Sequence, residues 1–183
     1  MEANMAEMNV NILLVDDEAN ILKSLSRLLK NYSLTLATSG AEALALAKDT
    51  AFDLVISDYR MPGMDGVAFL TQFRQIQPDS IRMILTGYAD LEGLQNAINN
   101  AEVFRFINKP WTNLEICHAV ENGLEHKRIL QENKMLADQV RRQQAQLSEQ
   151  EAILRALEEE EPGITHVDWA ADGSIIIDEK DFE

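Results

Sequence analysis

Short apolar runs alternate along this chain with segments whose apolar residues recur every three or four positions. The runs are too short for helices and rich in branched side chains, so they predict buried strands. They lie at residues 10–15, 34–37, 53–57, 81–85 and 103–107. The intervening segments predict helices with one apolar face. These helices are expected at residues 18–30, from 39–40 onward, from 66 to about 76, at 89–99, and from 110–111 onward.

Strands that alternate with helices require crossover connections, and such connections produce a parallel sheet with helices on both faces. The sequence therefore predicts an α/β fold with a doubly wound, five-stranded parallel sheet. Residues 9–125 are expected to form this domain, after a disordered amino terminus at 1–8.

Polar side chains follow four of the predicted strands. Asp16 and Asp17 follow the first strand, Asp58 the third, Thr86 the fourth and Lys109 the fifth. Ligands of open parallel sheets bind outside the carboxyl ends of the strands, at the point where the strand order reverses. These five side chains are therefore expected to meet at one edge of the sheet.

The chemistry of this group points to phosphoryl transfer. Two carboxylates about 4 Å apart repel each other by roughly 4 kcal/mol at an effective dielectric of 20, so three require a counter-charge. Mg2+ prefers oxygen ligands and also neutralises phosphoryl groups, and Mn2+ is an alternative cation. The Asp58 carboxylate can form an acyl phosphate. Lys109 would contact the phosphoryl oxygens as a point charge, and Thr86 would donate its hydroxyl to them.

Simpler explanations exist for each residue. Asp16 and Asp17 can cap the following helix, although a cap needs only one acid. Lys109 can be a surface lysine and Thr86 a strand-end hydroxyl. A magnesium-dependent hydrolase of small phosphate esters would share the carboxylate cluster, but it would turn over its substrate, whereas a switch would take up one phosphoryl group per chain.

The ordered set of motifs resembles the receiver domain of two-component response regulators, which has a flavodoxin-like fold. The motifs are Asp16-Asp17, Asp58, the loop from Met61 to Gly66, Thr86-Gly87 and Lys109-Pro110. The resemblance implies that a sensor histidine kinase phosphorylates Asp58, and that the domain is a switch and no enzyme beyond its own phosphorylation and dephosphorylation.

The resemblance also implies the role of each site residue. Asp17, Asp58 and the main-chain carbonyl of Arg60 would bind Mg2+ directly, with Asp16 acting mostly through water. Thr86 would be the hydroxyl switch and Phe106 the aromatic switch, although Phe106 can also be a plain core or edge aromatic. The Lys109–Pro110 bond is often cis in this family. Arg60 and Tyr88 occupy variable positions beside the acceptor, where they would screen the phosphoryl group from water and slow its hydrolysis.

Two segments, Leu85–Asp90 and Phe104–Trp111, resemble a narrower group of receivers. Receivers of this group are attached to cyclic-di-GMP phosphodiesterase, serine phosphatase or hydrogenase-regulator outputs. The alternative to a self-contained switch is therefore a receiver fragment of a longer regulator whose output enzyme is missing from this chain. The position of the natural stop codon would distinguish the self-contained switch from the receiver fragment.

Residues 126–161 are expected to continue the last helix of the domain as a coiled coil. A heptad places His126, Asn133, Val140, Leu147 and Leu154 at a positions. It places Ile129, Leu136, Gln143, Gln150 and Leu157 at d positions. Six of these ten residues are apolar, and an Asn at an a position favours a parallel pair, so a parallel homodimer through 126–157 is predicted. The alternative is a single solvated helix.

Charge and composition limit the partners. Lys and Arg number 16 against 31 Asp and Glu, a net charge of -15, which argues against direct binding of nucleic acid. Residues 162–183 form an acidic tail, in which Asp172-Gly173 between two β-prone runs predicts a hairpin. A single cysteine, Cys117, and the lack of an apolar run of membrane-spanning length predict a cytoplasmic protein with no membrane partner. An unknown downstream protein would read the switch.

Overall fold

The computed structural model of this chain describes residues 10–87 and 101–160. The chain forms two units, residues 1–131 and 132–183. The predicted helix at 89–99, Tyr88, the amino terminus at 1–8 and the acidic tail with its hairpin lie outside the described residues.

The first unit contains a five-stranded, entirely parallel sheet in the order β2-β1-β3-β4-β5. Its strands are β1 (Asn11–Val15), β2 (Ser33–Ala37), β3 (Leu54–Asp58), β4 (Ile81–Gly87) and β5 (Arg105–Lys109). The strand order reverses between β1 and β3, as in flavodoxin-like folds. The predicted doubly wound sheet is therefore confirmed.

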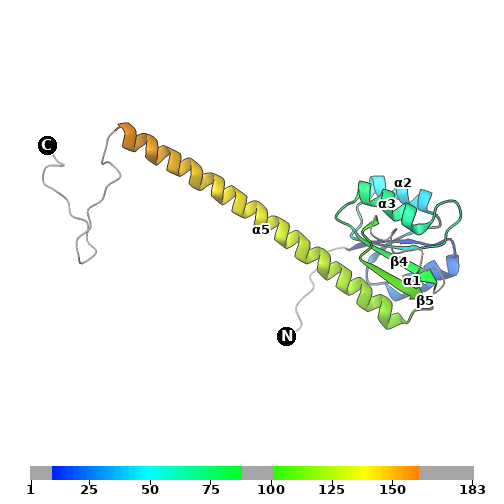
Figure 1. Ribbon diagram of the computed structural model, residues 1–183. Coiled ribbons are helices and arrows are strands. Elements are labelled where there is room, and N and C mark those ends of the chain that lie inside the picture. The colour runs from blue at the N-terminus through cyan, green and yellow to red at the C-terminus, as the bar shows by residue number, and fades with distance from the viewer. Residues whose placement is uncertain (1–9, 88–100, 161–183) are drawn as a thin grey trace, which may run out of the picture. The chain divides into compact units, whose positions relative to one another are not determined.

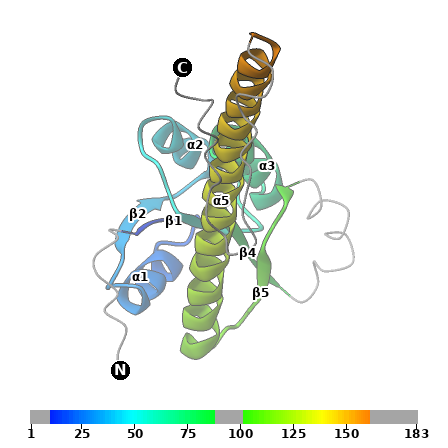
Figure 2. The same ribbon diagram turned by 90° about the vertical axis from the view of Figure 1, so that its left-hand side faces the viewer.

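Helices cover both faces of this sheet (Figures 1 and 2). They are α1 (Ala19–Leu28), α2 (Gly40–Asp49), α3 (Gly66–Ile76) and α5 (Asn113–Glu160). The first turns of α5 and helix α1 pack on one face through a core that includes Leu14, Leu25 and Val120. Helices α2 and α3 pack on the other face through a core that includes Ala43 and Phe69.

Local hydrogen bonds explain where two helices begin. Ser39 is the N-cap of α2, and its hydroxyl accepts a hydrogen bond from the main-chain N–H of Glu42 at 3.3 Å. The Glu42 carboxylate in turn accepts from the N–H of Thr38 at 2.7 Å, which lowers the pKa of Glu42. Asp65 caps α3 by accepting from the N–H of Ala68 at 2.7 Å. Both caps satisfy donors that the first turn leaves free.

Most element boundaries differ from the sequence prediction by one or two residues, and three of the differences lie in β4, β5 and α5. Strand β5 covers 105–109 instead of 103–107, because Phe104 lies before the strand with its N–H bonded to the carbonyl of Arg82. Strand β4 extends through Thr86 and Gly87, which pair in register with Asn108 and Lys109. Helix α5 begins at Asn113 and not at 110–111, and Thr112 bonds reciprocally with Glu115 at its start.

Gly66, the first residue of α3, allows the helix to begin directly against the end of β3. A Cβ at this position would lie 2.1 Å from the main-chain oxygen of Asp58, so the backbone would have to move. We expect Gly66→Ala to destabilise the protein by about 2–3 kcal/mol, as overpacked positions do. Gly63→Ala is the control, because a Cβ there meets no neighbour and only the φ of 79° is unfavourable, which costs about 1–2 kcal/mol.

Urea unfolding of both variants measures this difference. An equal or smaller loss of stability in Gly66→Ala than in Gly63→Ala would contradict the close approach of α3 to Asp58.

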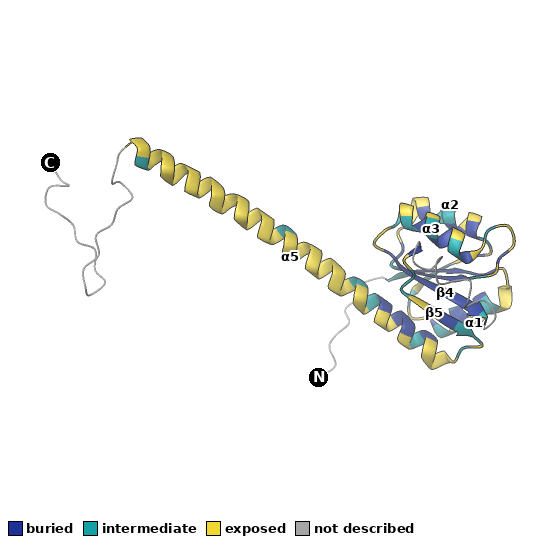
Figure 3. Ribbon diagram, viewed as in Figure 1, coloured by how far each residue is buried: buried dark blue, intermediate teal, exposed yellow. Residues whose placement is uncertain are grey.

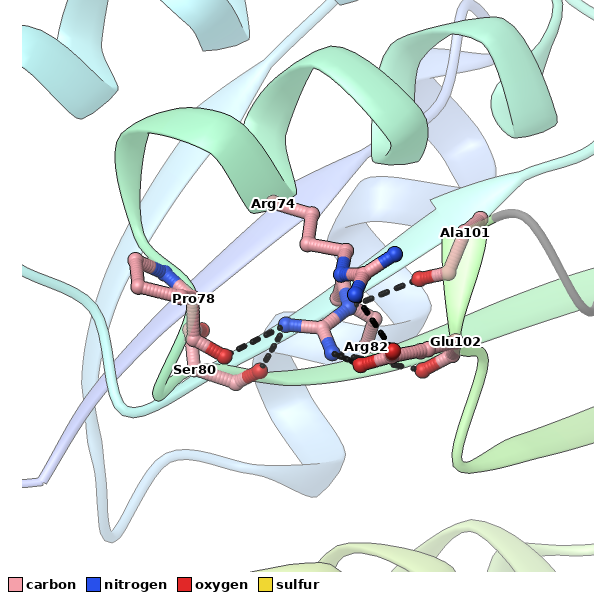
Figure 4. A network of polar contacts seen from close by, with 6 residues as sticks. All are labelled: Arg74, Pro78, Ser80, Arg82, Ala101 and Glu102. Carbon is pink, nitrogen blue, oxygen red and sulfur yellow. Dashed lines mark hydrogen bonds and ion pairs between the residues drawn. The ribbon is translucent and has the colours of Figure 1, made fainter.

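Arg82 organises the amino ends of β4 and β5 (Figure 4). Its side chain is 7% exposed, and its guanidinium donates to the carbonyl oxygens of Ala101 at 2.9 Å and Ser80 at 2.6 Å. It also donates to the carbonyls of Pro78 and Glu102. The Glu102 carboxylate forms ion pairs with Arg82 and Arg74, and Glu102 has a φ of 46°, a region that residues other than glycine rarely adopt. The network therefore fixes both connections that lead into these strands.

The second unit contains the part of α5 beyond Gln131. Figure 3 shows this part as almost entirely exposed. Its large apolar side chains are exposed by 41–66%, and they are Met135, Leu136, Val140, Leu147, Ile153, Leu154 and Leu157. Among the helices of the described part of the chain, none combines the length and apolar character needed to cross a bilayer.

Candidate phosphorylation and metal site

The candidate site lies at the carboxyl ends of β1, β3 and β5. Asp16 directly follows β1, Asp58 is the last residue of β3, and Lys109 is the last residue of β5. Leu14, Ile56 and Ile107, each two residues earlier, all belong to the core on the α1 and α5 side. Because side chains alternate along a strand, the three polar residues project from this same face of the sheet.

Carboxylate oxygens of Asp16, Asp17 and Asp58 lie within 4.8 Å of one another. Asp16 and Asp58 are buried, whereas Asp17 is exposed and gives the cluster access to solvent. Three convergent carboxylates with one open side match the needs of Mg2+, which takes one or two carboxylates and keeps several waters. The donor set therefore fits a divalent cation.

Lys109 supplies a positive charge inside this cluster. Its Nζ atom lies 2.7 Å from Oδ1 of Asp58 and 3.2 Å from Oδ2 of Asp16. Burial lowers the pKa of Lys109, but the hydrogen bond and charge of Asp58, together with Asp16, outweigh burial and leave this pKa above its usual value. The ammonium is therefore charged at neutral pH and lies beside the Asp58 carboxylate.

The environment of Asp16 favours a nearby cation. Burial raises the pKa of Asp16, and the negative charge of Asp58 adds to this effect. The main-chain N–H of Glu18, which donates to Oδ1 of Asp16 at 2.8 Å, and the Lys109 ammonium oppose it without cancelling it. The N-cap of α1 is Glu18, and no side chain caps this helix, so neither Asp16 nor Asp17 has the capping role that the alternative gave them. Asp16 instead faces Asp58 and Lys109.

The remaining predicted site residues that the structure describes are Arg60, Thr86 and Phe106. Arg60 lines an open groove with Asp17, Tyr59, Met61, Pro62 and Asp65. Thr86 is 1% exposed and its hydroxyl donates to the carbonyl of Gly87 at 3.2 Å. Phe106 is 48% exposed and lines a second groove with Phe104 and Glu115. The Lys109–Pro110 bond is cis.

The structure thus brings Asp16, Asp17, Asp58 and Lys109 into direct contact or near contact, with Arg60 beside them. It leaves Thr86 and Phe106 outside the carboxylate cluster. Sequence reasoning missed Arg82, although a charged residue inside the apolar run 81–85 was an available signal. It also missed the stack of His126 on Phe104 and the ion pair of Lys127 with Asp53, for which the sequence carries no local signal.

A parallel sheet with this topology, ending in a carboxylate cluster and one lysine, defines the receiver class of signalling domains. The chain belongs to the response regulator receiver domain family, which it matches over residues 12–121. Receiver domains of this family are signalling modules that take phosphoryl groups from sensor histidine kinases.

Two curated relatives are transcriptional regulators. The chain is 33% identical over 122 residues to the hydrogenase transcriptional regulatory protein HoxA of Cupriavidus necator, which covers 66% of this chain and 25% of that protein. It is 35% identical over 123 residues to the transcriptional regulatory protein GlrR of Escherichia coli, covering 66% of this chain and 28% of that protein. The chain thus spans about a quarter of the length of these relatives.

Two solved structures match the receiver part. One is a structure of adenylate cyclase from Rhodopirellula baltica, which is 37% identical with a TM-score of 0.68; the match covers 72% of this chain and 98% of that chain. The other is the signal receiver domain of an HD domain-containing protein from Pseudomonas fluorescens, 36% identical with a TM-score of 0.66 and the same coverage. Receiver domains similar to this one therefore occur in proteins with different names.

Proposed function

We propose that this chain is a phosphorylation-dependent switch that accepts a phosphoryl group on Asp58 from a sensor histidine kinase. The observation that carries the proposal is the contact of Lys109 Nζ with Oδ1 of Asp58, at 2.7 Å, inside a cluster of three carboxylates. If Lys109 served only a structural ion pair, one carboxylate would be enough to balance its ammonium. The three carboxylates here leave negative charge that a divalent cation can balance.

Asp58 carries the chemistry. One of its carboxylate oxygens forms a bond to phosphorus, while the bond between phosphorus and the kinase imidazole nitrogen breaks. That nitrogen leaves with the bonding electron pair and is the acceptor for a proton, and the product is an acyl phosphate. Mg2+, held by Asp58, Asp17 and the carbonyl of Arg60 with Asp16 acting through water, would neutralise charge on the phosphoryl oxygens.

Lys109 and Thr86 respond to the new group. The Lys109 ammonium already lies against Asp58, so a small movement brings it onto a phosphoryl oxygen. The Thr86 hydroxyl exchanges its 3.2 Å bond to Gly87 for a bond to the phosphoryl group. The half-exposed side chain of Phe106 then changes its position. The equilibrium between two conformational states of the domain shifts as a result.

The change is relayed through α5. The exposed apolar positions of residues 126–157 pair with a second copy as a parallel dimer, and an unknown downstream protein reads the result. The chain accordingly comprises a receiver at 9–125, a coiled-coil helix at 126–161 and a tail at 162–183.

A second reading treats the chain as the receiver portion of a longer regulator. The observation that favours it is coverage, because the chain spans only about a quarter of the curated relatives that it matches. The output would then be an enzyme such as a cyclic-di-GMP phosphodiesterase or a protein phosphatase, as the sequence alternative proposed.

Phosphorylation by acetyl phosphate, followed by intact-mass measurement, tests the switch. With Mg2+ we expect one phosphoryl group per chain. Addition of EDTA is expected to reduce the rate at least about 100-fold, since neutralisation of phosphoryl charge is worth several kcal/mol. Mn2+ is expected to restore it. Multiple turnovers of acetyl phosphate with rapid release of phosphate would instead indicate a hydrolase.

Arg60 is proposed to shield the phosphoryl group from water, together with Tyr88. Arg60 lines the open groove beside Asp17, on the side from which water reaches the cluster. We expect Arg60→Ala to shorten the lifetime of the phosphorylated form about fivefold, which corresponds to roughly 1 kcal/mol in the barrier. Loss of label over time after removal of the donor measures this, and an unchanged lifetime would exclude the shielding role.

A further inference from the structure

Three contacts hold helix α5 where its receiver-bound part ends. At Gly123 a Cβ would lie 2.6 Å from Cε of Met83, so the helix lies directly on the sheet. One turn later, the imidazole of His126 stacks on the ring of Phe104, with centroids 5.1 Å apart and planes inclined by 29°. Lys127 Nζ lies 2.6 Å from Oδ1 of Asp53. The domain therefore holds its own helix as far as residue 127.

Phe104 is the fixed partner in the stack. Its main-chain N–H donates to the carbonyl of Arg82 at 2.8 Å, and its ring packs against the core on the α1 and α5 side. The Arg82 guanidinium also holds the carbonyls of Ala101 and Glu102, the residues that lead into Phe104 (Figure 4). A change in the stack must therefore come from movement of His126 with the helix.

His126 can also occupy a position in the interface of a coiled-coil dimer. It is the first a position of the heptad whose next apolar members, Ile129, Leu136 and Val140, are 45%, 59% and 50% exposed. In a two-stranded coiled coil an a residue packs into the facing helix as a knob into a hole. One imidazole cannot fill that hole and stack on Phe104 of its own receiver at the same time.

We propose that the stack of His126 on Phe104 is an autoinhibitory contact that weakens the pairing of α5 with a second copy of this chain. The inference rests on the proposed dimer and adds its regulation. The occupant is a second copy, because the exposed apolar residues recur at heptad spacing from 129 to 157 with Asn133 at an a position. The two states of each imidazole exclude each other, and a dimer must release one stack from each of its two chains. Weakening the stack by a given factor therefore lowers the dimer dissociation constant by that factor twice, once for each chain.

Phe104→Leu is the direct test, because it removes the aromatic partner and leaves His126 and the heptad unchanged. We expect sedimentation equilibrium, without phosphoryl donor, to show a dimer dissociation constant about five- to 100-fold lower than in the wild type, the range that two stacked pairs span, one in each chain. Phe104→Tyr keeps the ring and is expected to behave as the wild type. His118→Leu is the helix control, because His118 is exposed and lies at neither an a nor a d position.

Ring-current shifts show whether the stack of His126 on Phe104 forms in solution. The ring protons of His126 should lie upfield in the wild type and in Phe104→Tyr, and lose this shift in Phe104→Leu. His126 protons with no upfield shift in the wild-type monomer would overturn the proposal.

Two further outcomes separate the inference from the proposed dimer. A wild type that dimerises while Phe104→Leu stays within twofold of its dissociation constant would overturn the autoinhibitory contact alone. A wild type and variant that remain monomeric at every concentration would overturn the dimer itself, and the inference with it, and would assign the apolar positions of α5 to another protein.

Discussion

Asp58→Asn is expected to abolish phosphoryl incorporation from acetyl phosphate, with a rate at least about 1000-fold below that of the wild type. The amide lacks the anionic oxygen that attacks phosphorus, and covalent catalysis depends on that nucleophile. The substitution keeps the shape of a side chain that is 9% exposed, so the fold should persist. Intact-mass measurement after incubation with Mg2+ and donor gives the result directly.

Asp65→Asn is the matched control for this variant. Asp65 lines the groove beside Asp17, but its carboxylate caps α3 through the N–H of Ala68, and it is absent from the carboxylate cluster. Asparagine is also a good N-cap, so both fold and phosphorylation should survive. Full incorporation in Asp58→Asn, or an equal loss in both variants, would contradict the assignment of Asp58 as acceptor.

Arg82→Met is expected to cause the largest loss of stability, about 3–5 kcal/mol, as removal of one partner from a buried ionic network does. Methionine retains the apolar stem but leaves four main-chain carbonyls without their donor. Glu102 would also lose one of its two cationic partners while holding a φ of 46°. Since the whole free energy of unfolding of a domain is about 5–15 kcal/mol, the variant should unfold at much lower urea concentration.

Arg74→Met provides the comparison for this network. Arg74 pairs with the same Glu102 carboxylate, but its side chain is 33% exposed. Partly exposed ion pairs contribute about 0–1 kcal/mol, so this variant should remain close to the wild type. Equal stability losses in the two variants would show that the carbonyl contacts of Arg82 do not hold the strands.

The positions of the site residues could be predicted from the sequence because a parallel sheet brings the carboxyl ends of its strands to one edge. Asp16, Asp58 and Lys109 meet there for that reason alone. The start of β5 was predicted two residues too early, because Val103 and Phe104 are as apolar as the residues of a buried strand. The hydrogen bond from the N–H of Phe104 to the carbonyl of Arg82 precedes the paired residues of β5, and the sequence does not show this bond.

Contacts between distant side chains lay beyond the sequence pattern. The guanidinium of Arg82 reaches carbonyls 19 and 20 residues away, and no local periodicity encodes such a bond. The heptad placed His126 in a dimer seam, whereas the structure places its ring on Phe104. Periodicity identifies which face of a helix is apolar but not which of two partners each residue contacts.

Borohydride trapping would identify the phosphorylated residue itself. The protein is phosphorylated with acetyl phosphate and Mg2+, then reduced, which converts an aspartyl phosphate to homoserine, and the digested peptides are sequenced by mass. We expect homoserine at position 58, dependent on the cation and absent when EDTA is added. Homoserine at any other aspartate, or an unmodified Asp58 in folded, metal-loaded protein, would contradict it.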